Sequence, residues 1–252
     1  MCVVGVDGCP VGWIAVGRRR IDDFPSARVF ATFAELLEAY PDDATIAVDM
    51  PIGLPDFTRQ GGRGPEALVR PLIGQRQSSV FSIPSRAAVY AEVDPFSTVE
   101  TWYAAHRRAS EVARRTSDPP RGVSIQAFAI FAKIREVDVL IRERPELRDR
   151  VHESHPEVAF MLLNGGQAMQ TPKKIKGSVN PAGLNERKAL LVRCGHASEF
   201  LDRAPPSGAT GDDLVDAACM MLVADRIRRG EAVSFPDPPG LDGFGIPVAI
   251  HA

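Results

Sequence analysis

The sequence contains C-V-V-G-V-D-G at residues 2–8 and A-T-I-A-V-D-M at residues 44–50, two short apolar runs that each end close to an aspartate. Apolar runs of this length followed by turn-forming residues predict buried strands. Asp7 and Asp49 then stand at the carboxyl ends of core strands, the sheet edge where α/β proteins usually bind ligands. Either aspartate alone fits a solvated turn, because Asp-Gly and Asp-x-Pro are good turn sequences. If the strands are adjacent and parallel, both carboxylates come within reach of one divalent cation, which is the interpretation we favour.

The residues between these runs continue an α/β pattern. Two further strands are expected at 12–17 and 27–31, and residues 33–40 have apolar side chains at helical spacing. Thr32 is the expected N-cap of this helix, and Glu35, three residues later, would complete a capping box. The chain therefore opens in the order strand, strand, strand, helix, strand.

The middle of the chain has a different composition. Residues 57–145 are Arg-rich and predict a helical insertion within a single domain that covers residues 1–252. From 57 to 144 there are 14 Lys and Arg against 9 Asp and Glu, whereas the rest of the chain is acidic. A basic middle favours an anionic ligand held near a carboxylate-rich centre, and it also fits a solvated helical surface. The other expected elements are helices at 97–115, 124–144, 185–194 and 212–229, strands near a sheet edge at 151–160 and 244–250, and a loop at 164–183.

The overall composition excludes several classes of protein. With 252 residues, 44% hydrophobic and 25% charged, the chain is neither disordered nor a disulfide scaffold. A net charge of −2 argues against a generally basic nucleic-acid coat protein. The longest strongly apolar stretch, 217–224, is far shorter than the ~20 residues of a membrane span, so no membrane partner is expected. The four cysteines form no C-x-x-C pair and no secretory signal is visible, so we expect a reduced, cytoplasmic protein.

A third group of acids lies in T-G-D-D-L-V-D-A-A-C-M-M at residues 210–221. Asp212 fits an N-cap or a first-turn acid that faces the helix dipole. Asp213 and Asp216 are three residues apart and share one face of an otherwise apolar helix. Asp216 would be costly to bury unpaired, so a metal or a basic residue should compensate its charge. Asp213 is the more accessible of the two, and both are candidate site residues.

The segment H-E-S-H-P-E at residues 152–157 offers a further acid. In an extended strand Glu153, His155 and Glu157 would share one face, although Pro156 bends the strand and breaks that count. The spacing matches no zinc signature. We therefore take Glu153 alone as an additional candidate metal ligand.

Together, five motifs resemble the predicted ribonuclease H-like nuclease family known as domain of unknown function 429. This resemblance implies a five-stranded mixed sheet of order 3-2-1-4-5, with strands 1 and 4 adjacent and parallel and the helical insertion between strands 4 and 5. In the wider superfamily, acids on strand 1, strand 4 and the last helix hold two divalent metals, which implies catalytic and metal-binding roles for Asp7, Asp49 and Asp213 or Asp216. In order, the motifs are G-V-D-G-C-P-V-G-W, A-V-D-M-P-I-G-L-P, S-S-V-F-S-I-P-S-R, H-E-S-H-P-E and D-D-L-V-D-A-A.

The function expected from these acids is hydrolysis of a phosphodiester, in a nucleic acid or in another substrate. Such chemistry needs a deprotonated water and a neutralised leaving oxygen, which two cations about 3.5–4 Å apart can provide. Oxygen ligands favour Mg²⁺ or Mn²⁺ as the cofactor. Side chains that could hold phosphates are Arg63, Arg70, Arg76, Arg86, Lys173, Lys174 and Lys176, with Ser79 or Ser85 at the mouth of the site.

Two alternatives remain open at this stage. A non-catalytic binding protein could retain the ribonuclease H-like fold, although the presence of both Asp7 and Asp49 favours an enzyme. A phosphotransferase is the other alternative, since D-G-C-P-V-G-W (7–13) resembles the phosphate-binding first hairpin of the actin-like kinases, which however need a duplicated domain. The sequence lacks a P-loop and a G-x-G-x-x-G motif, so these nucleotide-binding classes are disfavoured.

Overall fold

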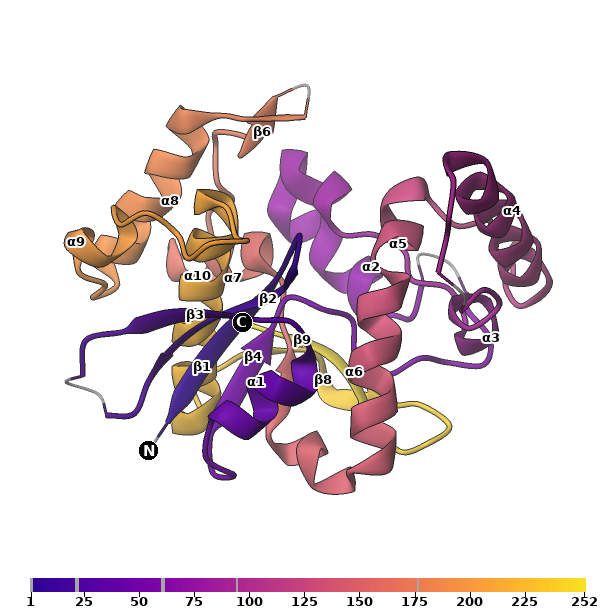
Figure 1. Ribbon diagram of the computed structural model, residues 1–252, viewed down its shortest axis with the longest axis horizontal. Helices are drawn as coiled ribbons and strands as arrows, with labels where there is room; N and C mark the ends of the chain where they lie inside the picture. Colours follow the sequence, from indigo (N-terminus) through magenta and orange to yellow (C-terminus); the bar gives the residue numbers. More distant parts are fainter. Residues whose placement is uncertain (1, 21–22, 60–61, 94, 176) are drawn as a thin grey trace.

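A five-stranded mixed sheet forms the centre of the molecule (Figure 1). The computed structural model describes residues 2–20, 23–59, 62–93, 95–175 and 177–252. The strand order is β3-β2-β1-β4-β5; β1 pairs antiparallel with β2 and parallel with β4, and β4 pairs parallel with β5. The predicted order 3-2-1-4-5 is therefore confirmed. The strands are β1 (Val3–Cys9), β2 (Gly12–Arg18), β3 (Ser26–Phe30), β4 (Thr45–Val48) and β5 (Val151–Glu153).

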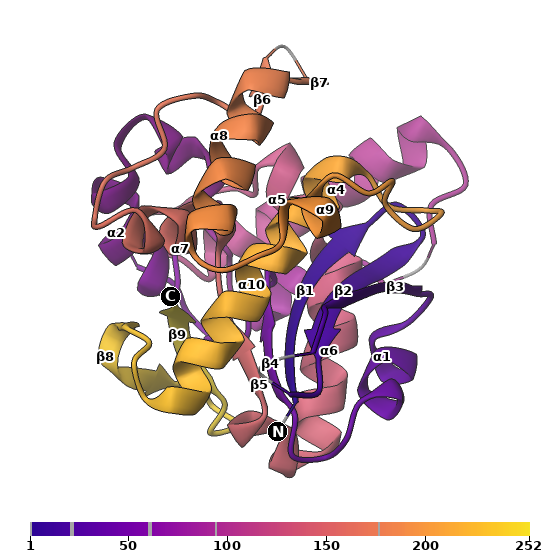
Figure 2. The same cartoon turned by 90° about the vertical axis from the view of Figure 1, so that its left-hand side faces the viewer.

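Alternating side chains of the central strands enter two hydrophobic cores. Val4 and Val6 of β1 face α1 (Phe33–Ala39) and α6 (Phe131–Glu143), while Val3 on the opposite face packs toward α10 (Gly211–Arg229). Helices α7 (Pro156–Leu163) and α8 (Pro181–Arg193) complete the second layer, as Figure 2 shows with α10 running across the sheet. Helices thus flank both faces of the sheet, as expected for an α/β fold.

The closest approach of a helix to the sheet occurs at Gly5. A Cβ atom on Gly5 would lie 2.1 Å from the carbonyl oxygen of Ala217 and 2.0 Å from the backbone nitrogen of Met221. Only glycine therefore lets α10 rest directly on β1. This contact fixes the height of α10 over the strand and brings Asp216, which precedes Ala217, toward the end of β1.

The first hairpin is longer than the sequence suggested. A turn was expected directly after Asp7-Gly8, but β1 continues to Cys9 and the turn occupies Pro10 and Val11. Gly12 begins β2 with φ +149°, and a Cβ there would lie 2.1 Å from the carbonyl oxygen of Phe30. Asp7 is consequently part of the paired strand, with a backbone that the ladder holds in place.

The predicted helix cap at Thr32 is confirmed in part. The Thr32 hydroxyl accepts the backbone N–H of Glu35 at 3.2 Å. The Glu35 carboxylate, however, accepts the N–H of Ala31 at 3.2 Å and not the N–H of Thr32 that a capping box requires. Gly230 ends α10 in the left-handed conformation (φ +69°), directly after the helix expected at 212–229.

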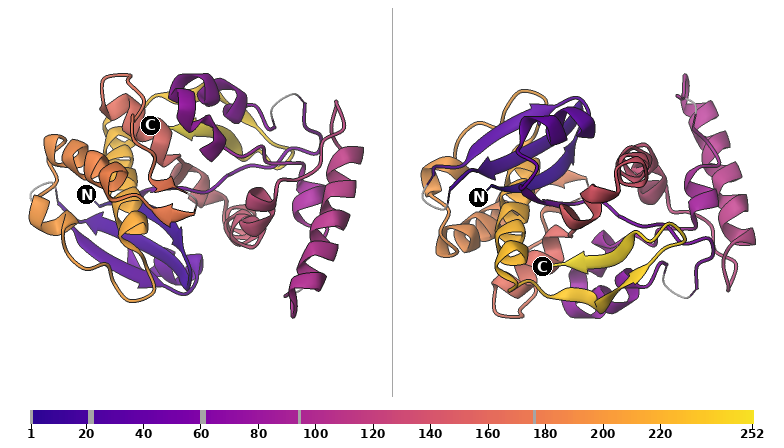
Figure 3. Two further views of the ribbon diagram at one scale, coloured as in Figure 1. Left: turned by 90° about the horizontal axis from the view of Figure 1, so that it is seen from above. Right: turned by 90° about the horizontal axis from the view of Figure 1, so that it is seen from below.

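The segment between β4 and β5 is helical, as expected. Helix α6 belongs to the core beneath the sheet, where it buries Phe131 and Ile134, and Trp13 on β2 donates its indole N–H to Glu136 of this helix at 3.0 Å. The helix expected at 124–144 is broken at Ile130 into α5 and α6. Figure 3 shows α4 at the end of the molecule farthest from β1–β3. The helices of this segment are α2 (Pro65–Val69), η1 (Arg70–Ser79), α3 (Arg86–Val89), α4 (Val99–Arg115), α5 (Ile125–Ala129), α6 and η2 (Pro145–Asp149).

Three expectations for the C-terminal half were wrong in detail. The strand expected at 151–160 ends at Glu153, because Pro156 begins α7, and proline at the first helical position is favourable. The loop expected at 164–183 contains the hairpin β6 (Lys174–Ile175) and β7 (Ser178–Val179). The final strand, β9 (Pro247–His251), pairs with β8 (Ser234–Leu241) in a separate sheet, and it meets the edge of the main sheet through an isolated parallel bridge between His251 and Ser154, the residue after β5.

The short helix α9 (Ser198–Leu201) follows α8. Among the described residues, no helix combines the length and the apolar character that crossing a bilayer requires.

Candidate metal centre

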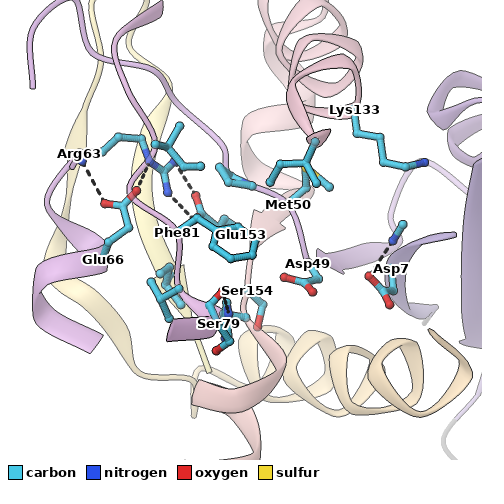
Figure 4. Close-up of a pocket in the computed structure, with 17 residues that line it drawn as sticks. Asp7, Asp49, Met50, Arg63, Glu66, Ser79, Phe81, Lys133, Glu153 and Ser154 are labelled. Carbon is cyan, nitrogen blue, oxygen red and sulfur yellow. Dashed lines mark hydrogen bonds and ion pairs between the residues drawn. The ribbon is translucent and has the colours of Figure 1, made fainter. Parts of the chain in front are cut away.

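Asp7 and Asp49 lie side by side on the two central parallel strands. Val6 of β1 pairs with Val48 of β4, and the backbone N–H of Asp49 donates to the carbonyl oxygen of Val6 at 2.9 Å. Side chains alternate along both strands, so Asp7 and Asp49, one residue beyond this pair, point to the same face of the sheet. Figure 4 shows the two carboxylates next to each other at the ends of their strands.

Asp216 of α10 completes a cluster of three carboxylates. Asp7, Asp49 and Asp216 each offer one oxygen atom, and these atoms all lie within 4.8 Å of one another. Two strands and a helix therefore bring together residues that are far apart in the sequence. We call this group the carboxylate cluster.

Asp213, the other candidate on α10, has a different role in the structure. Thr210 is the N-cap of α10; its hydroxyl accepts the N–H of Asp213 at 3.3 Å, and the Asp213 carboxylate accepts the N–H of Thr210 at 2.8 Å. This capping box engages an Asp213 oxygen in helix capping, and the residue is not a member of the carboxylate cluster. The preference for Asp213 over Asp216 on grounds of accessibility is thus not what the geometry supports. The pattern T-x-x-D at residues 210–213 was the signal that could have shown this.

Burial raises the pKa of all three cluster carboxyls, and the charges of neighbouring acids raise it further. Burial raises the pKa of Asp7 well above its ordinary value, and the charges of Asp49 and Asp216 raise it further. Burial raises the pKa of Asp49 and of Asp216 to about 7, although the charge of Lys173 opposes the shift at both. Asp216 Oδ1 is buried and has no hydrogen-bond partner. A bound cation would favour the ionised form of all three groups and would provide the partner that Asp216 Oδ1 lacks.

Lys173 is the nearest positive charge to the cluster. Its ammonium donates to Asp216 Oδ2 and lies 3.6 Å from Asp212 Oδ1. Burial lowers the pKa of Lys173, but the charges of Asp216 and Asp212 outweigh it and raise the pKa above its ordinary value. Lys174, expected to hold phosphate, is paired with Asp212 at 3.2 Å. Lys176 lies outside the described residues.

Glu153 and Arg63, expected as a metal ligand and a phosphate-binding residue, bind each other. The Arg63 guanidinium donates to both carboxylate oxygens of Glu153, at 2.6 and 2.9 Å, and its Nε donates to Glu66 at 2.8 Å. Glu153 also accepts the backbone N–H of Ile52 at 2.7 Å, and all three side chains are at most 4% exposed. Burial raises the pKa of Glu153 to about 7 although Arg63 opposes the shift. Both side chains line the pocket beside the carboxylate cluster, but Arg63 is bound to carboxylates of the protein itself and Glu153 is not part of the cluster.

The other expected phosphate-binding residues are distributed over two regions. Arg86 pairs with Asp138 and, at 2.6 Å, with Asp242, so both of its partners are carboxylates of the protein itself. Ser85 is fully buried and caps α3, so it is not at the mouth of the site. Ser79 does line the pocket beside the carboxylate cluster, with its hydroxyl donating to the carbonyl oxygen of Arg76 at 2.8 Å. Arg70 does not line this pocket but two other cavities, and it donates to the carbonyl oxygen of Val80 and to the hydroxyl oxygen of Ser82.

A pocket of about 190 Å³ opens beside Asp7 and Asp49. Lys133 of α6 lies on its wall (Figure 4). Its ammonium is 4.5 Å from the centre of the Trp13 ring and donates to the carbonyl oxygen of Gly12. Burial lowers the pKa of Lys133, although nearby acids including Asp7 oppose the shift. Sequence reasoning missed this residue. The sequence feature that could have identified Lys133 is its position on the apolar face of the predicted helix, three residues after Ile130 and four before Val137.

Fold and site together define a class: an α/β protein with a mixed 3-2-1-4-5 sheet and a carboxylate cluster at the ends of its two central parallel strands. The family model described as "Protein of unknown function (DUF429)" matches residues 5–240, so the chain belongs to this family. Searches of curated proteins and of solved structures find no match to the chain.

Proposed function

We propose that the protein is a divalent-metal-dependent phosphodiesterase, acting as a nuclease on a ribonuclease H-like fold. The observation that carries this proposal is the convergence of Asp7, Asp49 and Asp216 to within 4.8 Å at the end of β1 and β4. Strand order and parallel pairing agree with the expectation from the ribonuclease H-like resemblance and support it. Cytoplasmic location remains part of this proposal.

The donor set fits a hard cation. Three carboxylates offer oxygen ligands only, which suit Mg²⁺ or Mn²⁺. Without a cation, three acids would share the positive charge of Lys173, and Asp216 Oδ1 would stay buried without a partner. When bound, a divalent cation supplies charge neutralisation at the phosphate and a water that is acidic enough to attack near neutral pH.

The protein's own side chains would position the phosphate and the metal-binding carboxylates. Asp7 and Asp49 lie on rigid, paired strands and define the position of the reacting phosphate, since the pocket opens beside them. Lys133, on the pocket wall, would give a phosphate oxygen one of the protons that its bond to the Gly12 carbonyl oxygen leaves over. Lys173 is a positioning residue, because it fixes the carboxylate of Asp216 through a direct ion pair.

A non-catalytic ribonuclease H-like binding protein is the second candidate. The observation in its favour is the ion pair between Lys173 and Asp216, which already compensates part of the negative charge without any metal. The phosphotransferase alternative gains no such support. The described residues form a single five-stranded sheet of this type, whereas the actin-like arrangement requires two.

The test is Mn²⁺-dependent cleavage of fluorescently labelled DNA and RNA oligonucleotides by the wild type and by two variants purified identically, Asp49→Asn and Asp213→Asn. We expect Asp49→Asn to lose activity by about 10²-fold or more, since a ligand to the cation is removed. Asp213→Asn should retain activity, because that side chain caps α10. Equal activity in the wild type and Asp49→Asn would favour the non-catalytic alternative.

A further inference from the structure

Two adjoining cavities lie behind the pocket of the carboxylate cluster. Their volumes are about 380 and 910 Å³, and both are lined by Arg70, Ser82, Arg121 and Gly122. We call the two together the arginine groove. Among the described residues, no aspartate or glutamate lines either cavity, whereas Arg59 also lines the smaller one.

The centre of the groove is a hydroxyl group between two guanidinium groups. Arg70 donates to the hydroxyl oxygen of Ser82 at 2.8 Å, and Arg121 approaches the same oxygen at 3.4 Å. Burial lowers the pKa of Arg70; Glu66 opposes this shift, and the neighbouring charge of Arg121 adds to it. Like charges held this close favour an anion between them.

Two acids in this region are themselves paired with arginines. The carboxylate of Glu66 accepts two hydrogen bonds from Arg63, and exposed Asp118 lies 3.9 Å from Arg59. Within the described residues, Arg121 forms no ion pair within 4.0 Å. The charge of the groove is therefore positive, in contrast to the chain as a whole.

The groove also adjoins the carboxylate cluster. Phe81 and Val80 line both the larger cavity and the pocket beside Asp7 and Asp49, and Ile83 lines both that pocket and the smaller cavity. The extended segment 80–83 thus forms the wall between a positively charged groove and an acidic pocket. The half-buried ring of Phe81 at this wall offers an apolar face to a base.

We propose that the arginine groove binds the sugar–phosphate backbone of a nucleic-acid strand, with phosphates at Arg70 and Arg121, while a neighbouring phosphodiester of the same strand lies at the carboxylate cluster. The contact at the carboxylate cluster rests on the proposed function, whereas the contacts at Arg70 and Arg121 do not. Hydroxyl and amide donors along the groove suit the same ligand: Ser78, Ser82, Ser117, Ser124, Gln77 and Gln126. A polynucleotide is therefore favoured over a small phosphodiester as the substrate.

The test measures binding of a labelled oligothymidylate by fluorescence anisotropy in EDTA, over a range of salt concentrations. The variants are Arg121→Gln and Arg121→Lys, with Arg107→Gln as the control, because Arg107 is exposed on α4 and lines neither cavity. We expect Arg121→Gln to weaken binding by about ten-fold, equivalent to ~1.4 kcal/mol. Loss of one phosphate contact should also reduce the slope of log K against log salt by about 0.7. Arg121→Lys should keep most of the slope, and Arg107→Gln should resemble the wild type.

Three outcomes would overturn the proposal. The wild type could fail to bind the oligothymidylate, or Arg107→Gln could weaken binding as much as Arg121→Gln. The third is displacement of the labelled oligothymidylate by polyaspartate as effectively as by unlabelled oligothymidylate. Mn²⁺ titration of the same preparations separates this proposal from the proposed function. Oligothymidylate binding without Mn²⁺ binding would support the groove and contradict the hydrolase. Mn²⁺ binding without oligothymidylate binding would contradict the groove and leave the hydrolase with a small substrate.

Discussion

Asp7 and Asp49 follow residues that pair with each other on two parallel strands, and the N–H of Asp49 donates to the carbonyl oxygen of Val6 at 2.9 Å. Their backbones therefore cannot separate without disruption of the sheet. With Asp216 above them, they form an arrangement in which burial and repulsion oppose ionisation. The protein carries an electrostatic cost at this position that a bound cation would remove.

This cost predicts a pH dependence of stability in the metal-free protein. In the folded state burial raises the pKa of Asp49 from its ordinary value of 3.8 to about 7, so the folded state holds the proton more tightly than the unfolded state. Its contribution to stability is complete below about pH 4 and is lost as the pH rises through about 7. Asp49→Asn should therefore raise the Tm in EDTA at about pH 8 relative to the wild type, at ~2–4 °C per kcal/mol for a chain of this size.

Calorimetry of both proteins from about pH 5 to pH 8 checks this prediction. The difference in Tm between variant and wild type should grow with pH, and saturating Mn²⁺ should remove it by stabilising the wild type alone. A difference in Tm that stays constant over this range would show that Asp49 carries no raised pKa.

Substitution of Lys173 should have opposite effects on stability and on metal affinity. Lys173→Gln leaves buried Asp216 without its cation, whereas Asp212 keeps its ion pair with Lys174, so we expect a loss of about 3–5 kcal/mol of stability in EDTA. Removal of a positive charge beside the cluster should at the same time strengthen Mn²⁺ binding. Urea denaturation and calorimetric titration measure the two effects, and Lys188→Gln, which breaks an ion pair with exposed Asp202, is the matched control. Weaker Mn²⁺ binding in Lys173→Gln would contradict the expectation that the charge of Lys173 competes with the metal.

Glu153→Gln should affect stability but not metal binding. The substitution leaves the buried guanidinium of Arg63 without one of its two carboxylate partners, and a loss of about 3–5 kcal/mol is expected. The affinity for Mn²⁺ should stay within about two-fold of the wild type, because Glu153 lies outside the carboxylate cluster. A Mn²⁺ affinity reduced by ten-fold or more in a folded variant would restore Glu153 as a metal ligand.

The sequence was most informative where one residue pattern determines one local structure. Two apolar runs that end in aspartate predicted both Asp7 and Asp49, because parallel strands place their carboxyl ends at one edge of the sheet. The choice between Asp213 and Asp216 depended on how α10 is capped and on its contact with Gly5, and the second of these is a tertiary contact. The ion pair of Arg63 with Glu153 joins residues 90 positions apart, so no local pattern could separate a phosphate-binding arginine from a buried one.

Calorimetric titration of Mn²⁺ into the wild type, Asp7→Asn and Asp213→Asn tests the central claim most directly. Metal affinity is a property of the bulk protein, whereas nuclease activity can come from a trace contaminant. The account predicts saturable binding by the wild type, loss of binding in Asp7→Asn, and binding close to that of the wild type in Asp213→Asn, whose carboxylate caps α10. Binding that is unchanged in Asp7→Asn, or absent from the wild type, would contradict the carboxylate cluster as a metal centre.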